Sequence, residues 1–196
     1  MTRLILARHG VTEWNIAGRF QGQADPPLTA AGWQQAESLA EVLAASDIQA
    51  VYSSDLQRAY NTAQAVAKRL GLPVQVDRRL REVSQGVWEG MLHADILAQY
   101  AAEWAAREQD PLHNRPPGGE SVAEVAARTW AAADEIARLH AAGPVLVVSH
   151  GLSLATLICR ALGRPLAEAR HHIPENAVPV PIDWTAREAI HQGDHD

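Results

Sequence analysis

Three short, almost uninterrupted apolar runs constrain what this chain can fold into more than any other feature. They cover residues 3–7, 48–53 and 144–149. Runs of this length without alternating polar residues are typical of strands that are buried on both faces, as in parallel sheets. Stretches with helical periodicity separate them. This alternation predicts an α/β fold, a three-layer sandwich with a mostly parallel central sheet and helices on both faces.

The helical periodicity is clearest over residues 56–70, where apolar residues recur every three or four positions. Ser54 and Gln57 have the spacing of a capping box at its start, and Ser121 and Glu124 have the same spacing before another helix. The remaining helices are expected over 29–45, 92–107, 121–142 and 152–162, extended segments over 74–76 and 80–83, and an edge strand over 178–184.

Length and composition bound the class of protein. We expect 196 residues to form a single domain, 1–196, with a terminal tail at 192–196. A net charge of −6 gives no general attraction to nucleic acid or to a membrane surface. One cysteine, Cys159, excludes an intrachain disulfide. No signal peptide or membrane span is visible, so we expect a cytoplasmic protein.

Two of the apolar runs end in the same way, in His9-Gly10 and in His150-Gly151. Ligands of open α/β sheets bind beyond the carboxyl ends of the strands. A lone histidine there would be interpreted as a structural residue. Two His–Gly pairs at equivalent strand ends instead favour one shared site.

Arginines accompany these histidines. Arg8 adjoins His9, and Arg58 falls in the first turn of the helix that follows the second apolar run. A cation at a helix start opposes the helix dipole unless an anion binds there. A salt bridge from Arg58 to Asp55 is the structural alternative. Glu82 is a candidate general acid for a leaving oxygen, or equally a surface carboxylate.

A longer series of motifs resembles one known family, the histidine phosphatase superfamily in its phosphoglycerate mutase-like branch. The resemblance covers most of residues 3–160, and its order and spacing make it specific. The matching pieces are Arg8-His9-Gly10-x-Thr12-x-x-Asn15, Gln21-Gly22-x-x-Asp25-x-Pro27-Leu28-Thr29, Ser53-Ser54-Asp55-Leu56-x-Arg58-Ala59, Leu80-x-Glu82-x-x-x-Gly86-x-Trp88-Glu89-Gly90, Pro117-Gly-Gly-Glu120-Ser121 and Val148-Ser149-His150-Gly151.

The resemblance implies a role for each matching residue. His9 would be the nucleophile that takes the phosphoryl group, His150 would stabilise the transition state, and Glu82 would act as general acid and then as general base. The residues that would bind the phosphate or the substrate are Arg8, Asn15, Gln21, Gly22, Arg58 and Gly151.

These roles describe a metal-independent phosphomonoesterase that hydrolyses a small phosphorylated metabolite through a phosphohistidine and needs no cofactor. Residues 91–119 would form a cap of helix and loop over the site. Selectivity would come from this cap and from residues 21–25 and 171–177.

Three other functions are weighed against this one. A phosphoglycerate mutase-type phosphotransferase is disfavoured because residues 91–119 carry few basic groups, among them Arg107, His113 and Arg115. A metal hydrolase built on the histidines is disfavoured because adjacent arginines would repel the cation. A binding protein without catalysis should have lost the nucleophile or the acid.

Two further expectations concern packing and assembly. Trp33, Trp104 and Trp130 are predicted to lie in the core, and Trp14 and Trp88 to pack beneath the site loops. A homodimer is an open alternative, but two prolines within residues 178–181 argue against transferring a dimer edge from the family.

Overall fold

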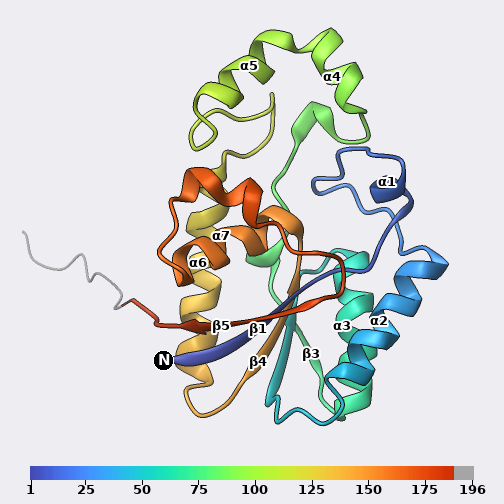
Figure 1. Cartoon of the computed structure of the whole chain (residues 1–196), viewed down its shortest axis with the longest axis vertical. Coiled ribbons are helices and arrows are strands. Elements are labelled where there is room, and N and C mark those ends of the chain that lie inside the picture. The colour runs from blue at the N-terminus through green and yellow to red at the C-terminus, as the bar shows by residue number, and fades with distance from the viewer. Residues whose placement is uncertain (188–196) are drawn as a thin grey trace, which may run out of the picture.

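A five-stranded sheet organises the protein, whose computed structural model describes residues 1–187 (Figure 1). The tail predicted for 192–196 lies outside these residues. The strand order is β3-β2-β4-β1-β5, and β5 alone runs antiparallel to its neighbour. The predicted α/β fold is confirmed. The strands are β1 (Thr2–Arg8), β2 (Ala50–Ser53), β3 (Val74–Val76), β4 (Val145–Ser149) and β5 (Pro179–Trp184).

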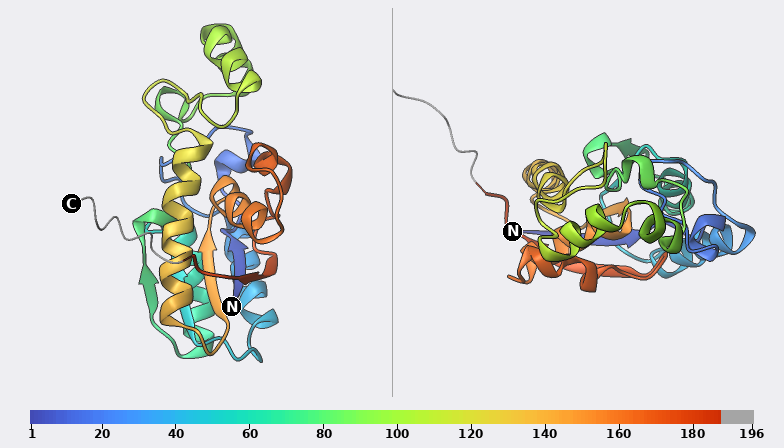
Figure 2. Two further views of the ribbon diagram at one scale, coloured as in Figure 1. Left: turned by 90° about the vertical axis from the view of Figure 1, so that its left-hand side faces the viewer. Right: turned by 90° about the horizontal axis from the view of Figure 1, so that it is seen from above.

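Helices cover both faces of the sheet, which confirms the three predicted layers (Figure 2). Because side chains alternate along a strand, Leu4 and Leu6 of β1 face one core while Ala7 faces the other. The first core lies beneath α6 and α7, and the second lies beneath α2 and α3. The helices are α2 (Ala30–Val42), α3 (Gln57–Leu70), α6 (Val122–Leu139) and α7 (Gly151–Ala161).

The pairing of β1 with β4 decides where the two histidines meet. The strands are parallel, and Arg8 stands opposite Ser149 in the register. The next residue of each strand is therefore a histidine. The backbone N–H of His9 donates to the carbonyl oxygen of Ser149 at 3.0 Å, which continues the ladder by one bond.

A group of short elements lies beyond the carboxyl ends of the strands, outside the three layers. Its helices α4 and α5 stand out in Figures 1 and 2. Residues 92–107 were predicted as one helix, but the backbone of Tyr100, with φ −135° and ψ 38°, divides it into α4 and α5. The elements of this group are α1 (Glu13–Ile16), η2 (Gly86–Trp88), α4 (His93–Gln99), α5 (Ala101–Gln109) and η3 (Leu166–His172); η1 (Arg78–Leu80) follows β3.

Two local predictions are wrong. Residues 80–83 were predicted as extended, but Leu80 ends the turn η1 and the segment pairs with no strand of residues 1–187; the Arg128 guanidinium instead binds two of its carbonyl oxygens. The Ser54–Gln57 capping box is absent as well. The N–H of Gln57 donates instead to the Asp25 carboxylate at 2.9 Å. The capping box of Ser121 with Glu124 is confirmed.

The tryptophan predictions hold in part. Trp88 is fully buried, whereas Trp33 is 44% exposed on α2, so its expected place in the core is wrong. The edge strand is confirmed as β5, in which Pro179 and Pro181 stand opposite alternate residues of β1. Proline lacks an N–H and is tolerated at such an edge. Among the described residues, no helix is long and apolar enough to cross a membrane.

Candidate active site

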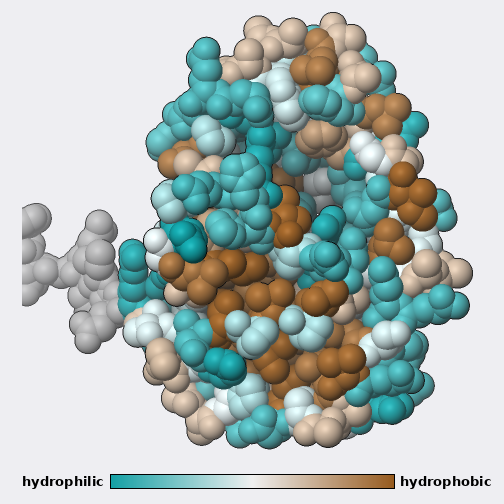
Figure 3. Space-filling model, in the orientation of Figure 1, coloured by the Kyte–Doolittle hydropathy of each residue, from teal (hydrophilic) through white to brown (hydrophobic). Residues whose placement is uncertain are grey.

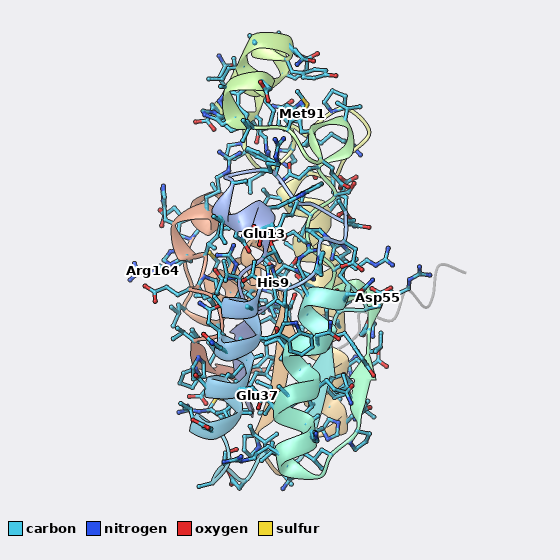
Figure 4. All side chains as sticks on the ribbon, turned by 90° about the vertical axis from the view of Figure 1, so that its right-hand side faces the viewer. His9, Glu13, Glu37, Asp55, Met91 and Arg164 are labelled. Carbon is cyan, nitrogen blue, oxygen red and sulfur yellow. The ribbon has the colours of Figure 1, made fainter. Side chains whose placement is uncertain are left out.

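His9 lies at the end of β1, and its ring is held in one tautomer. The side chain is 2% exposed and sits in the interior at the level where the strands end (Figure 4). Its Nδ1 lies 2.7 Å from the carbonyl oxygen of Gly10, which can only accept a proton. Nδ1 therefore carries the hydrogen. Nε2 accepts a hydrogen bond from Arg58 Nε at 3.3 Å, so Nε2 is the unprotonated ring nitrogen and carries the lone pair.

The electrostatic surroundings keep His9 neutral. Burial is the main cause that lowers the pKa of His9 well below its usual value, and the charge of Arg58 adds to it. The neutral ring is the form that a nitrogen nucleophile requires.

Arg58 is fully buried at the start of α3, and hydrogen bonds to backbone carbonyl oxygens orient its guanidinium. Nη1 donates to the carbonyl oxygen of Ala24 at 2.7 Å, and Nη2 donates to that of Gly22 at 2.8 Å. The nearest carboxylate, that of Asp25, is 3.6 Å away. Burial lowers the pKa of Arg58 to about 10, so it stays charged at neutral pH. The salt bridge to Asp55 considered above is absent.

Arg8 and His150 bring further buried polar atoms to the same place. Among the described residues, Arg8 Nε and both ring nitrogens of His150 have no hydrogen-bond partner. The His150 ring lies 5.2 Å from that of His9, centroid to centroid. Burial lowers the pKa of His150 well below its usual value. Buried polar atoms are normally satisfied, so the Arg8 Nε–H and the N–H of the neutral His150 ring are arranged for a ligand that accepts hydrogen bonds.

Glu82 reaches the same site from the segment after η1. Its carboxylate accepts the N–H of Leu152 at 3.1 Å and that of Ser153 at 3.2 Å, both in the first turn of α7. The N–H of Val83 donates to it at 2.9 Å. The start of α7, which follows His150 directly, therefore holds the candidate acid beside the two histidines.

The remaining predicted ligand residues surround this cluster. Asn15 and Gln21 line a cavity together with Arg8, Arg58 and Glu82. Asn15 uses its Oδ1 to accept the N–H of Thr12 at 3.1 Å, so its Nδ2 is the end left for a ligand.

The two predicted glycines fill tight positions. Gly22 has φ +54°, and a Cβ there would lie 2.3 Å from Glu89 Oε1. A Cβ on Gly151 would lie 3.0 Å from Ile173 Cγ2, which is a tight contact, and 3.5 Å from Glu82 Oε2.

Several residues that shape the site were not identified from the sequence. Asn176 donates to the carbonyl oxygen of His9 at 2.6 Å, and Gln23 donates to that of Glu82 at 3.2 Å. Glu89 accepts the N–H groups of Gln23 and Ala24 at 2.8 Å each, which fixes the loop that orients Arg58. Glu89 stands within a quoted motif, but its partner lies 66 residues away, and no local pattern reveals such a contact.

A second cavity of about 310 Å³ extends from this cluster toward α5. Arg8, Glu82 and Gly151 form one end of it, and Phe20, Trp104 and Arg107 belong to the other. Within residues 1–187, no group of three or more His, Cys, Asp or Glu side chains is placed to hold a metal ion.

A neutral imidazole surrounded by arginine and histidine donors is an arrangement that suits phosphoryl transfer. Residues 4–191 match the profile of the histidine phosphatase superfamily (branch 1). The chain belongs to this superfamily. It is a histidine-type phosphatase, and the resemblance of the sequence motifs is confirmed.

Relatives of this phosphatase carry several names. Phosphoserine phosphatase 1 of Hydrogenobacter thermophilus is 36% identical over 86% of this chain and 80% of its own. Glucosyl-3-phosphoglycerate phosphatase of Mycobacterium tuberculosis is 40% identical, with coverage of 84% and 77%. A probable phosphoglycerate mutase of Proteus mirabilis is also 40% identical, with the same coverage.

Solved structures agree with the fold. The α-ribazole phosphatase of Shigella flexneri superposes with a TM-score of 0.86 at 32% identity, over 94% of this chain and 91% of its own.

Proposed function

We propose that this histidine phosphatase hydrolyses a small phosphate monoester through a phosphohistidine on His9, without a metal ion. The observation that carries the proposal is the His9 tautomer. Its Nδ1 is hydrogen-bonded to a carbonyl, and its Nε2 lone pair lies among the donors of Arg58, Arg8 and His150. A dianionic phosphoryl group placed there meets a nucleophile and buried donors together.

The first step transfers the phosphoryl group to the enzyme. His9 Nε2 attacks phosphorus, an N–P bond forms, and the bond from phosphorus to the ester oxygen breaks. Glu82, in its acid form, gives its proton to the departing alcohol. Arg8, Arg58 and His150 bind the equatorial oxygens. Stabilising the negative charge on these oxygens is the main task of a catalyst of phosphoryl transfer.

The second step returns His9 to its starting state. A water molecule attacks phosphorus while the Glu82 carboxylate takes its proton, and the N–P bond breaks to release inorganic phosphate. The two steps together use one water molecule and regenerate the neutral imidazole and the acid form of Glu82.

The test is turnover of p-nitrophenyl phosphate in excess EDTA. We expect the wild type to be active, His9→Ala to lose activity by at least about 10³-fold, and His113→Ala, an exposed histidine of the cap, to match the wild type. Rapid acid-free quenching should trap a phosphoryl group on nitrogen in the wild type but not in His9→Ala. Activity that EDTA abolishes, or that survives in His9→Ala, would contradict the proposal.

A phosphotransferase is the second candidate, because relatives of equal identity are named probable phosphoglycerate mutases. Two measurements separate it from hydrolysis: labelling of His9 by 2,3-bisphosphoglycerate, and conversion of 3-phosphoglycerate to 2-phosphoglycerate without release of phosphate. Hydrolysis predicts that inorganic phosphate appears in proportion to the substrate consumed.

A further inference from the structure

The cavity between the catalytic groups and the cap has the position that a leaving group would occupy, because Glu82 lines it. The surface is hollowed beneath α4 and α5 (Figure 3). Phe20, Trp104 and Ile173 give this cavity apolar walls. Its volume of about 310 Å³ accommodates an alcohol of several carbon atoms.

One lining residue, Arg107 of α5, is a buried cation without a counter-ion. It is 3% exposed. Its Nη1 donates to Gln85 Oε1 at 3.3 Å, and its Nε has no partner among the described residues. No carboxylate of residues 1–187 lies within 4.0 Å of it. Fully buried arginines are normally paired, because an uncompensated buried charge is costly.

The other contacts of Arg107 hold it in place but do not neutralise it. Its guanidinium lies 5.5 Å above the centroid of the buried Trp88 ring. Arg170, a second cation that lines the cavity, is paired with the half-exposed Glu108 at 2.6 Å. Burial, and then the charge of Arg170, lower the pKa of Arg107 to about 10, so Arg107 stays charged at neutral pH.

We propose that Arg107 binds a carboxylate on the alcohol part of the substrate, so that the phosphatase prefers phosphate monoesters carrying a carboxylate. This inference rests on the proposed function. The planar guanidinium suits a carboxylate. The Gln85 amide accepts from Arg107 through Oε1, so its Nε2 is left as a second donor at the same place. A second phosphate group would bring more negative charge toward Glu82, which lines the same cavity.

Two pairs of substrates test this directly, because the members of each pair differ by one carboxylate. O-phosphoserine is compared with O-phosphoethanolamine, and 3-phosphoglycerate with glycerol 3-phosphate. We expect kcat/KM of the wild type to favour the carboxylate member about 10- to 100-fold. Arg107→Met should abolish this preference, and Arg107→Lys should retain part of it. Arg115→Met, an exposed arginine of the same cap, should leave it unchanged.

The outcomes separate a binding role of Arg107 from a structural one. Turnover of p-nitrophenyl phosphate, which has no carboxylate, should fall by a clearly smaller factor in Arg107→Met than turnover of 3-phosphoglycerate. An equal loss on every substrate would show that Arg107 only supports packing on Trp88, and the proposal would be wrong. A wild type without preference, a preference that survives in Arg107→Met, or a stronger preference for propane-1,3-diol bisphosphate would also overturn it.

A binding measurement keeps this inference distinct from the proposed function. If the wild type hydrolyses none of these esters, hydrolysis is refuted, but the subsite can still be tested on His9→Ala. Calorimetric titration should then show 3-phosphoglycerate binding at least about 10-fold more tightly than glycerol 3-phosphate. Equal affinities would refute the carboxylate subsite by itself.

Discussion

The ion pair of Arg128 with Glu120 holds the segment that presents Glu82, and its removal should affect both stability and catalysis. Arg128 of α6 donates to carbonyl oxygens of residues 79, 81 and 82, and to both oxygens of Glu120, the latter at 2.9 Å each. Glu120 also accepts the N–H of Ser84 at 2.8 Å. Arg128 is thus a positioning residue that acts through the backbone of Glu82.

The magnitude follows from what each substitution leaves unpaired. The side chains of Arg128 and Glu120 are 19% and 25% exposed, so solvent screens the pair only in part. Arg128→Met leaves one carboxylate and three carbonyl oxygens short of a donor, which we expect to cost about 3–5 kcal/mol of unfolding free energy. Glu120→Gln removes the charge and replaces one acceptor oxygen by an NH2 group that faces a donor, but it keeps the other acceptor and should cost about 1–2 kcal/mol. We expect a coupling energy of about 1–3 kcal/mol between the two.

The assay is a double-mutant cycle by urea unfolding, followed by tryptophan fluorescence. The control cycle pairs Arg115→Met with Glu124→Gln, an ion pair whose side chains are 55% and 44% exposed, for which we expect less than about 1 kcal/mol. A coupling below about 0.5 kcal/mol for Arg128 with Glu120 would refute the reasoning. The catalytic arm compares esters: Arg128→Met should reduce kcat for an alkyl phosphate more than for p-nitrophenyl phosphate, whose leaving group departs without a proton.

The coupling should also depend on pH. Burial alone would raise the pKa of Glu120, but the hydrogen bonds from Arg128 and from the Ser84 N–H outweigh it and lower the pKa. A lowered pKa in the folded state gives stability that is present above the unfolded value of about 4.3 and is lost as the pH falls through the folded value. The coupling energy between Arg128 and Glu120 should therefore be larger at pH 7 than at pH 3.

Three other predictions follow from the site. Glu82→Gln should reduce kcat/KM about 10²- to 10⁴-fold for an alkyl phosphate but far less for p-nitrophenyl phosphate, and equal losses would argue against a general acid. His9 should stay neutral below its ordinary pKa of about 6.5, so its ring nitrogens should show no titration near that pH in ¹⁵N spectra. Gly22→Ala should cost about 2–4 kcal/mol in urea unfolding, because its Cβ would strike Glu89, whereas Gly118→Ala, also at positive φ but with open space, should cost about 1–2 kcal/mol.

Much of the fold could be predicted from the sequence because the decisive signals are local. The apolar runs that end in His9 and His150 identify two strands, and the rule for open sheets places both ends at one edge. The sequence did not show that β1 and β4 are direct neighbours. That adjacency brings the His9 and His150 rings to 5.2 Å.

The parts that could not be predicted depend on contacts between distant residues. At the start of α3 the N–H of Gln57 donates to the carboxylate of Asp25, 32 residues earlier, so the local Ser54–Gln57 spacing was misleading. The carbonyl of the neighbouring Gly10 sets the tautomer of His9, but its Nε2 accepts from Arg58, 49 residues later. Arg107 was noted only as one of few basic groups of residues 91–119, because its buried position depends on Gln85 and Trp88, which lie on the far side of α4 in the sequence, 22 and 19 residues earlier.

The type of partner separates the arginines of the site from those of the scaffold. Arg160 is paired with the Asp134 carboxylate at 2.8 Å, which orients it and also cancels its charge. Arg58 and Arg8 donate to carbonyl oxygens of Ala24, Gly22 and Pro174, which orient a guanidinium and leave its net charge available. The Asp25 carboxylate lies 3.6 Å from Arg58, beyond hydrogen-bond distance, so a phosphoryl group can bind without displacing a hydrogen-bonded carboxylate. The donors are therefore oriented during folding rather than in each turnover.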